Sequence, residues 1–231
     1  MATFVLIPGA GGVAWYWHRV VPLLEDAGHE AIAVDLPGDD ESAGLPEYTG
    51  LVFDAIGDRD GVVLVAQSLG AFTAPLVAAR TELERLVLVN AMVPAPGETP
   101  GEWWENTGSE PARVAAAERG GYAAEFDLHT HFLHDVPPEV AAAGEPHQRP
   151  EADAVFGSVC DFEAWPQIPI DVVAGESDRL FPVGFQRRLA QDRLGVEADP
   201  LPGGHLMALS QPDALADYLL GASMRPDSEG A

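Results

Sequence analysis

The sequence predicts an α/β protein with a mostly parallel sheet of about six strands and flanking helices. Short apolar runs alternate along the chain with amphipathic segments, which is the pattern of buried parallel strands covered by helices on both faces. One long stretch, rich in proline, glycine and aromatic residues, interrupts this alternation after the fourth run and predicts a helical cap inserted at residues 94–166. The 231 residues fit a single domain, 1–231.

Six apolar runs are the expected strands. Each has the length of a strand, and continuous apolarity is typical of strands that are buried on both faces. In chain order the runs are Thr3–Ile7, Ala31–Val34, Val62–Ala66, Leu86–Val89, Ile170–Ala174 and a weaker one at Val196–Leu201.

The first helix is expected after the first run. Its apolar face has the spacing of successive helical turns and consists of Trp17, Val20, Val21 and Leu24. Gly28 follows this face and is a suitable stop, because glycine readily adopts the left-handed conformation that ends many helices.

Two further helices are expected near the C-terminus. The first lies between Pro182 and Gly195 and has an apolar face made of Phe185, Leu189 and Leu194. The second is expected to have Ser210 as its N-terminal cap and Asp213 in its first turn. Residues 224–231 lose the apolar pattern, which predicts a disordered tail.

Composition and charge exclude several classes of partner. The net charge is −25, from 37 acidic and 12 basic residues, and a field this negative repels nucleic-acid phosphates and anionic membranes. We therefore expect a small-molecule substrate, no nucleic-acid or membrane partner, and leave a homodimer open. The N-terminal residues show no signal-peptide pattern, which predicts a cytoplasmic protein. Cys160 is the single cysteine and is expected to be a buried structural thiol.

A candidate nucleophile follows the third run. The segment A-Q-S-L-G at residues 66–70 joins a strand to an expected helix and is a variant of the G-x-S-x-G nucleophile elbow, with Ala66 in place of the first glycine. The turn at Ser68 is sharp, so its neighbours two residues away must be small. Pro75 is expected to kink the helix that follows. An ordinary small-residue turn is the alternative, and the strand–helix junction favours a nucleophile.

Candidates for the acid and the base lie downstream in the order that this type of site requires. A serine hydroxyl needs a base to accept its proton and an acid to orient that base. Asp178 follows the fifth run, and His205 follows the sixth run in a Gly-Gly-His loop. The alternatives are that Asp178 is only a helix cap, that His205 is a surface histidine, or that Glu176 is the acid. Their joint order favours the triad Ser68, Asp178 and His205.

A glycine-rich loop at residues 9–12 follows the first run. Such a loop lets main-chain N–H groups approach a developing oxyanion, and we assign the donors to Ala10 and Leu69. A dinucleotide-binding loop is the competing interpretation, with Asp35 as the acidic partner of the ribose. That interpretation leaves the candidate triad unexplained, so an oxyanion hole is favoured.

A family resemblance extends over the core of the chain. It is carried by PGAGGVAWYW at 8–17, VPLL at 21–24, AGH at 27–29, VDLP at 34–37, the serine elbow and residues 203–209, which resemble the plant methylesterase and hydroxynitrile lyase group. The resemblance implies an α/β-hydrolase fold with a helical cap. The plant lyases have a threonine in the oxyanion loop and a lysine after the catalytic histidine, where this chain has Gly9 and Leu206. Pro8 replaces the usual loop histidine. Because that lysine stabilises the cyanide leaving group, its absence favours ester hydrolysis.

The expected function is that of a carboxylesterase-like serine hydrolase without a cofactor. It would cleave a small, partly hydrophobic ester, thioester or lactone through an acyl-enzyme. The expected pocket residues are Gly9, Trp15, Trp103, Trp104, Phe132, Leu180, Phe181 and Met207. For Trp103 and Trp104, a place in the core of the cap is an equal alternative. A lyase or cyclisation catalyst on the same scaffold, and a small-molecule binder that keeps the triad, stay open as alternatives.

Three histidines in the cap have a spacing that can bind zinc. They are His129, His131 and His134, and no cysteine or spaced carboxylate set accompanies them. We therefore expect surface histidines and no metal site.

Overall fold

Six parallel strands form one sheet in the order β2-β1-β3-β4-β5-β6 in the computed structural model, which describes residues 1–224. The strands are β1 (Thr3–Ile7), β2 (Glu30–Ala33), β3 (Val62–Gln67), β4 (Arg85–Val89), β5 (Ile170–Gly175) and β6 (Ala198–Leu201). Every predicted strand is present, with small shifts at the ends, and the predicted α/β fold is confirmed.

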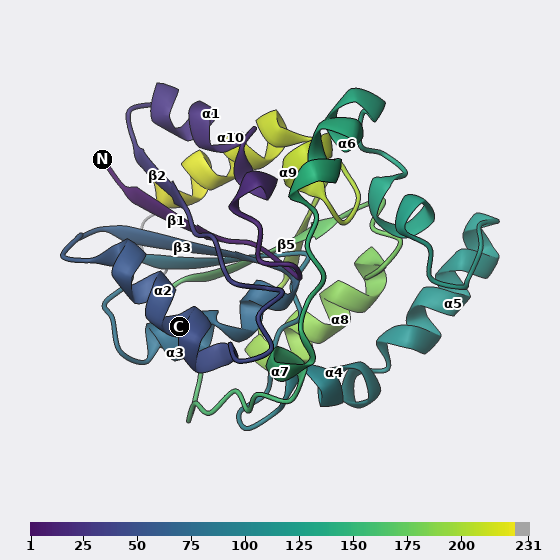
Figure 1. The fold of residues 1–231 in the computed structure, drawn as a ribbon, viewed down its shortest axis with the longest axis horizontal. Coiled ribbons are helices and arrows are strands. Elements are labelled where there is room, and N and C mark those ends of the chain that lie inside the picture. Colours follow the sequence, from purple (N-terminus) through teal and green to yellow (C-terminus); the bar gives the residue numbers. More distant parts are fainter. Residues whose placement is uncertain (225–231) are drawn as a thin grey trace.

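Helices cover both faces of the sheet (Figure 1). Those outside the insertion are η1 (Ala14–Trp17), α1 (Val21–Asp26), α2 (Leu45–Ile56), η2 (Ser68–Phe72), α3 (Ala74–Ala78), α8 (Val183–Leu194), α9 (Met207–Ser210) and α10 (Pro212–Ser223). Alternate side chains of β1 enter two cores: Val5 and Ile7 pack with α2, α3 and α8, whereas Phe4 and Leu6 pack with α1 and α10. Burial on both faces explains the continuous apolar runs of the sequence.

Local signals placed some helix boundaries incorrectly. The expected helix over 17–24 is divided into η1 and α1, because Pro22 lies in the first turn of α1 and prolines favour helix starts. Pro75 likewise lies in the first turn of α3, so it begins a helix and does not kink one. Ser210 is not the cap of the last helix: it ends α9, its hydroxyl is buried without a hydrogen-bond partner, and Gln211 takes the cap position.

The segment between β4 and β5 contains helices and no strand in the described structure. They are α4 (Pro100–Thr107), α5 (Ser109–Gly120), η3 (His129–Leu133), α6 (Pro138–Gly144), η4 (Glu145–His147) and α7 (Asp153–Phe156). In Figure 1 most of them lie to the right of the sheet, beyond the end toward which β1 runs. The insertion therefore stands near the carboxyl ends of the strands, where ligands bind in parallel sheets.

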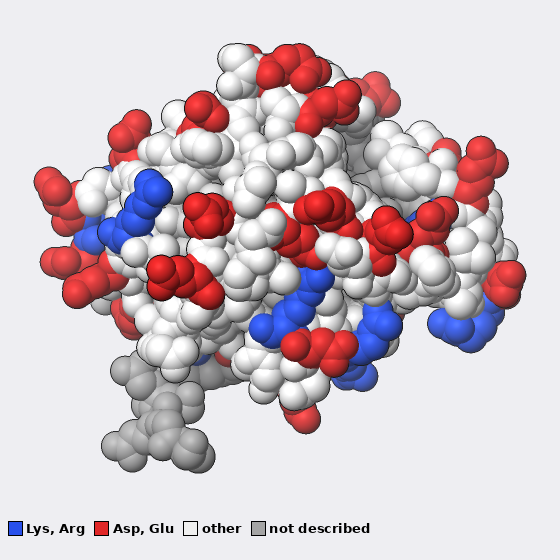
Figure 2. Space-filling view, turned by 90° about the horizontal axis from the view of Figure 1, so that it is seen from below, with Lys and Arg blue, Asp and Glu red and all other residues white. Residues whose placement is uncertain are grey.

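The surface carries the charge that the composition implies. Figure 2 shows acidic side chains spread over the whole face in view, with few basic ones between them. None of the helices in residues 1–224 combines the length and apolar character that a bilayer crossing requires. Cys160 is buried, as predicted. Of the expected tail, Met224 is exposed and residues 225–231 lie outside the described residues.

Candidate active site

Ser68 is the first residue after β3 and has a positive φ of 49°, which is a strained conformation for a residue other than glycine. A Cβ atom on Gly70 would lie 2.4 Å from the carbonyl oxygen of Pro8, so only glycine fits there. Ala66 is the last but one residue of β3 and is fully buried in the core. The elbow therefore accepts alanine at its first small position and requires glycine at its second.

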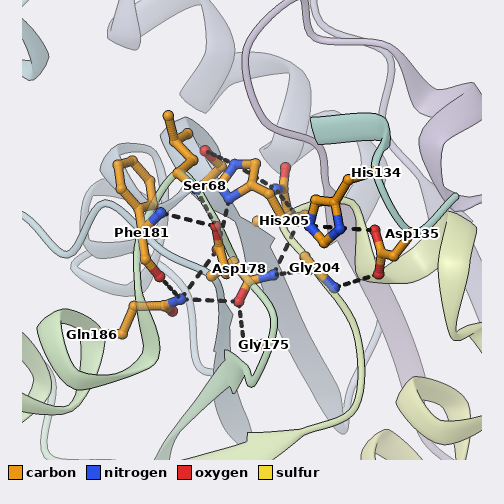
Figure 3. A network of polar contacts seen from close by, with 12 residues as sticks. Ser68, His134, Asp135, Gly175, Asp178, Phe181, Gln186, Gly204 and His205 are labelled. Atoms are coloured by element: carbon orange, nitrogen blue, oxygen red, sulfur yellow. Dashed lines mark hydrogen bonds and ion pairs between the residues drawn. The ribbon is translucent and has the colours of Figure 1, made fainter. Parts of the chain in front are cut away.

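The structure brings the three predicted triad residues together. Nε2 of His205 lies 3.0 Å from Oγ of Ser68, and Nδ1 of His205 lies 2.9 Å from Oδ2 of Asp178 (Figure 3). The serine follows β3, and the other two residues lie in the loops after β5 and β6. His205 and Asp178 are shielded from solvent, while Ser68 keeps 7% of its surface exposed toward a cavity.

Main-chain groups orient the carboxylate of Asp178. Its Oδ1 accepts hydrogen bonds from the N–H groups of Leu180 and Phe181, both at 2.8 Å, and Gln186 donates to its Oδ2 at 3.2 Å. Glu176, the alternative acid, is exposed on the same loop. The acid that faces the histidine is therefore Asp178.

Asn90 joins the acid loop to the histidine loop, and sequence reasoning missed it. It follows β4 with a φ of 46° and is fully buried. Its Nδ2 donates to the carbonyl oxygens of Gly204 at 2.9 Å and His205 at 3.1 Å. Its Oδ1 accepts from the N–H of Gly175 at 2.7 Å and from Gln186 at 3.2 Å. The sequence did offer one signal for it, because Asn90 is a polar residue directly after the apolar run Leu86–Val89.

The histidine loop also contacts the insertion. Asp135 accepts a hydrogen bond from the N–H of Gly204 at 2.6 Å (Figure 3). A Cβ atom on Gly204 would lie 2.7 Å from Asp135 and 2.8 Å from His134, so glycine is needed here for a close approach. Burial lowers the pKa of His134, which favours its neutral form. The rings of Phe132 and Phe181 stand edge-on to the ring of His205.

A cavity of about 520 Å³ opens above Ser68 between the strand ends and the insertion. Five predicted pocket residues line it: Trp15, Trp104, Phe132, Leu180 and Phe181. Further apolar wall residues, most of them in the insertion, are Phe126, Leu128, Leu133, Val140, Phe156 and Leu209. The wall is mainly apolar, which suits a hydrophobic ligand of modest size.

Three predicted pocket residues do not line the cavity. Trp103 is fully buried and donates from its indole nitrogen to the carbonyl oxygen of Val93 at 3.0 Å. Met207 is fully buried in the core that contains α10. Gly9 is pressed against the elbow, where a Cβ atom would lie 2.3 Å from the side-chain oxygen of Gln67. Trp103 and Met207 instead belong to the two hydrophobic cores, which lie beneath the residues that line the cavity.

The two predicted oxyanion donors, Ala10 and Leu69, both line the cavity together with Ser68. Ala10 belongs to a turn that is closed by a hydrogen bond of 3.0 Å from the N–H of Gly12 to the carbonyl oxygen of Gly9. Glu151 lies at the cavity wall beside this turn. Burial raises the pKa of Glu151, although hydrogen bonds from Tyr48 and the main chain act in the opposite direction.

The histidine cluster of the insertion is not wholly on the surface. His131 is fully buried, and its ring stacks on Phe126 with centroids 5.6 Å apart. His129 is exposed. Within residues 1–224, no group of three or more histidine, cysteine, aspartate or glutamate residues has the arrangement of a metal site. The expectation of surface histidines was therefore wrong for His131, whose ring packs against Phe126 and Tyr122, and His134 is half-buried.

Residues 4–218 match the model of the alpha/beta hydrolase family. The chain belongs to this family. It is similar to norfluorocurarine synthase 1 from a Strychnos species, with 24% identity over 94% of this chain and 93% of the relative. It is also similar to methylesterase 3 from Arabidopsis thaliana, with 29% identity over 53% of this chain and 54% of the relative.

Among solved structures, this α/β-hydrolase has the fold of a pyrethroid hydrolase from Sphingobium faniae JZ-2, with a TM-score of 0.78 and 23% identity. The superposition covers 97% of this chain and 98% of the other. The resemblance to the plant methylesterase group, predicted from the sequence motifs, is confirmed by these comparisons.

Proposed function

We propose that this α/β-hydrolase is a carboxylesterase-like serine hydrolase, which cleaves a small, partly hydrophobic ester, thioester or lactone. The observation that carries the proposal is the unbroken chain of hydrogen bonds from Ser68 through His205 to Asp178, beneath an apolar cavity. Relatives and neighbours named methylesterase and pyrethroid hydrolase support the ester bond as the target.

The proposed mechanism assigns one role to each of these groups. His205 accepts the hydroxyl proton of Ser68 as the serine oxygen attacks the acyl carbon. The main-chain N–H groups of Ala10 and Leu69 stabilise the oxyanion that forms. His205 then returns the proton to the leaving alkoxide, and a water molecule, activated by the same histidine, releases the acyl group. Asp178 orients the imidazole and stabilises its protonated form.

The cavity favours a neutral acyl group. Its wall is mainly apolar, and its volume of about 520 Å³ suits a small ligand. Arg149 lies on the wall, but its guanidinium already donates to the carbonyl oxygens of Gly11 and Gly12 and pairs with Asp35. These bonds leave it poorly disposed to hold an anionic substrate.

Replacement of the nucleophile tests the proposal. With p-nitrophenyl acetate and butyrate, Ser68→Ala is expected to lower kcat by about 10⁴-fold or more, because no other group can form the acyl-enzyme. A fluorophosphonate probe should label the wild-type protein at Ser68 and leave this variant unlabelled. Ser223→Ala is the matched control, since Ser223 lies in α10 and, among the described residues, its hydroxyl donates to the carbonyl oxygen of Leu220 in the same helix. Full esterase activity in Ser68→Ala would contradict the proposal.

Non-hydrolytic chemistry is the second candidate, because a relative matched over 94% of this chain is named a synthase. Turnover in ¹⁸O-labelled water separates the two. Hydrolysis places labelled oxygen in the acid product, whereas a lyase or cyclisation reaction forms product without it. A protein that is neither labelled by the probe nor active would be a binder that keeps the triad.

A further inference from the structure

The insertion forms hydrogen bonds with the glycine-rich loop at residues 9–12, which we call the oxyanion loop. The part of the insertion that contacts this loop is residues 149–152, which we call the clamp segment. Arg149 donates from Nε to the carbonyl oxygen of Gly11 and from Nη2 to that of Gly12, both at 3.1 Å. Glu151 accepts the N–H of Gly11 on its Oε2 at 2.5 Å. Both main-chain polar groups of Gly11 are therefore bonded to side chains of the insertion.

The clamp segment is itself anchored to the sheet-bearing part of the chain. The hydroxyl of Tyr48, from α2, donates to Oε1 of Glu151 at 2.6 Å. Arg149 pairs with Asp35, which follows β2, at 3.0 Å. The main chains are in direct contact as well, because a Cβ atom on Gly11 would lie 2.6 Å from the carbonyl oxygen of Arg149. The side chains that hold Gly11 are thus fixed by two other elements.

The oxyanion loop needs such external support. Three of the four residues of the Gly9–Gly12 turn are glycines, and glycine has the greatest conformational freedom of all residues. Gly11 and Gly12 have φ values of 83° and 67°. An oxyanion donor contributes to catalysis only when it is already in place before the charge develops. A turn of this composition would otherwise sample several orientations of the Ala10 N–H.

We propose that Glu151 and Arg149 are positioning residues, which hold the Gly9–Gly12 turn and with it the Ala10 N–H in place for the oxyanion. The inference rests on the proposed function, since it takes Ala10 as an oxyanion donor. The two side chains act through the main chain of Gly11 and Gly12 and not on the reacting atoms themselves. Their loss should therefore affect the transition state more than the bound substrate.

Variants of Glu151 test this role with p-nitrophenyl butyrate. Glu151→Ala is expected to lower kcat by about 10–100-fold with little change in KM, because a small misplacement of an oxyanion donor weakens transition-state stabilisation. The affinity for an alkyl trifluoromethyl ketone should fall by a similar factor, since its hemiketal oxyanion occupies the same site. Glu151→Gln keeps an oxygen for the Gly11 N–H and should recover most of the kcat. Glu145→Ala, an exposed change in the same insertion, is the matched control.

Two further variants serve if Glu151→Ala fails to fold. Arg149→Lys keeps the charge but loses the forked contact with two carbonyl oxygens, and it should also lower kcat selectively. Tyr48→Phe removes only the bond to Oε1 of Glu151, and its effect should be smaller than that of Arg149→Lys. Unchanged kcat and ketone affinity in folded Glu151 or Arg149 variants would overturn the positioning role while the wild type stays active. An inactive and unlabelled wild type would overturn the proposed function and this inference together.

Discussion

Replacing Asn90 by alanine is expected to destabilise the protein and to loosen the two loops that carry Asp178 and His205. The side chain of Asn90 is fully buried and makes four hydrogen bonds, two as donor and two as acceptor. Through them it links the end of β4 to Gly175 and Gly204. Alanine can make none of these bonds, so the substitution removes the hydrogen bonds that join the ends of β4, β5 and β6.

The magnitude follows from the groups that lose a partner. The carbonyl oxygen of His205 keeps a hydrogen bond from Gln67 at 3.3 Å, so its loss is partly compensated. The N–H of Gly175 loses its acceptor, Oδ1 of Asn90, and the carbonyl oxygen of Gly204 loses its donor, Nδ2 of Asn90. Each buried unpaired group costs about 1–3 kcal/mol. The left-handed backbone at this position costs an alanine about 1 kcal/mol more. The expected loss is therefore about 3–7 kcal/mol in the free energy of unfolding.

Urea unfolding followed by circular dichroism measures this loss. Asn90→Gly is the informative control, because glycine removes the amide without the backbone strain and should be less destabilised than Asn90→Ala by about 1 kcal/mol. In any folded variant, kcat for p-nitrophenyl butyrate should fall as the histidine loop loosens. A change below about 0.5 kcal/mol in both variants would refute the reasoning, because surface substitutions have effects of that size.

Two other substitutions test the acid and a buried ion pair. Asp178→Asn is expected to lower kcat by about 10⁴-fold with the fold intact, since an amide supports the wrong tautomer of the histidine; circular dichroism and esterase kinetics measure both quantities. Burial alone would raise the pKa of Glu98, but hydrogen bonds from Arg193 and Asn106 outweigh it and hold that pKa below its usual value. Its ionised form therefore stabilises the folded state above about pH 4.5, and this contribution is lost as the pH falls through the lowered pKa. In urea unfolding at pH 7, Glu98→Gln should have a free energy of unfolding about 1–3 kcal/mol below that of the wild type. This difference should shrink as the pH is lowered. A difference of equal size at all pH values would contradict the stabilising role of ionised Glu98.

The sheet could be predicted because its central strands, β1, β3 and β4, are buried along their whole length. A strand that is buried on both faces has a continuous apolar sequence, so such runs identify the strands. The segments between consecutive runs are then the crossover connections that join parallel strands. Helix boundaries were harder because the signals are local. Ser210 and Asp213 have the spacing of a capped start, but a separate short helix ends at Ser210 and the next begins at Pro212. The pattern cannot show to which of two adjoining helices a residue belongs.

The proximity of the three candidate triad residues could be predicted because each follows a strand end. Ser68, Asp178 and His205 each lie in the segment that follows an apolar run. The carboxyl ends of parallel strands share one edge of the sheet, so chain order is sufficient to bring the three residues there. Asn90 and Glu151 act through main-chain groups of segments that lie far away in the sequence. Nothing in their immediate sequence shows which loop they bond, and that information exists only in the folded structure.

The insertion contributes more than a cover for the pocket. Besides its apolar wall residues, it bonds the oxyanion loop through Glu151 and the histidine loop through Asp135. Phe132, from the same segment, lines the cavity and also stands against the ring of His205, with centroids 4.8 Å apart. A change of wall shape at Phe132 should therefore alter the position of the His205 ring as well as the fit of the substrate. It follows that Phe132→Leu should change kcat together with substrate preference, whereas Leu128→Ala, on the outer wall and 41% exposed, should change preference alone.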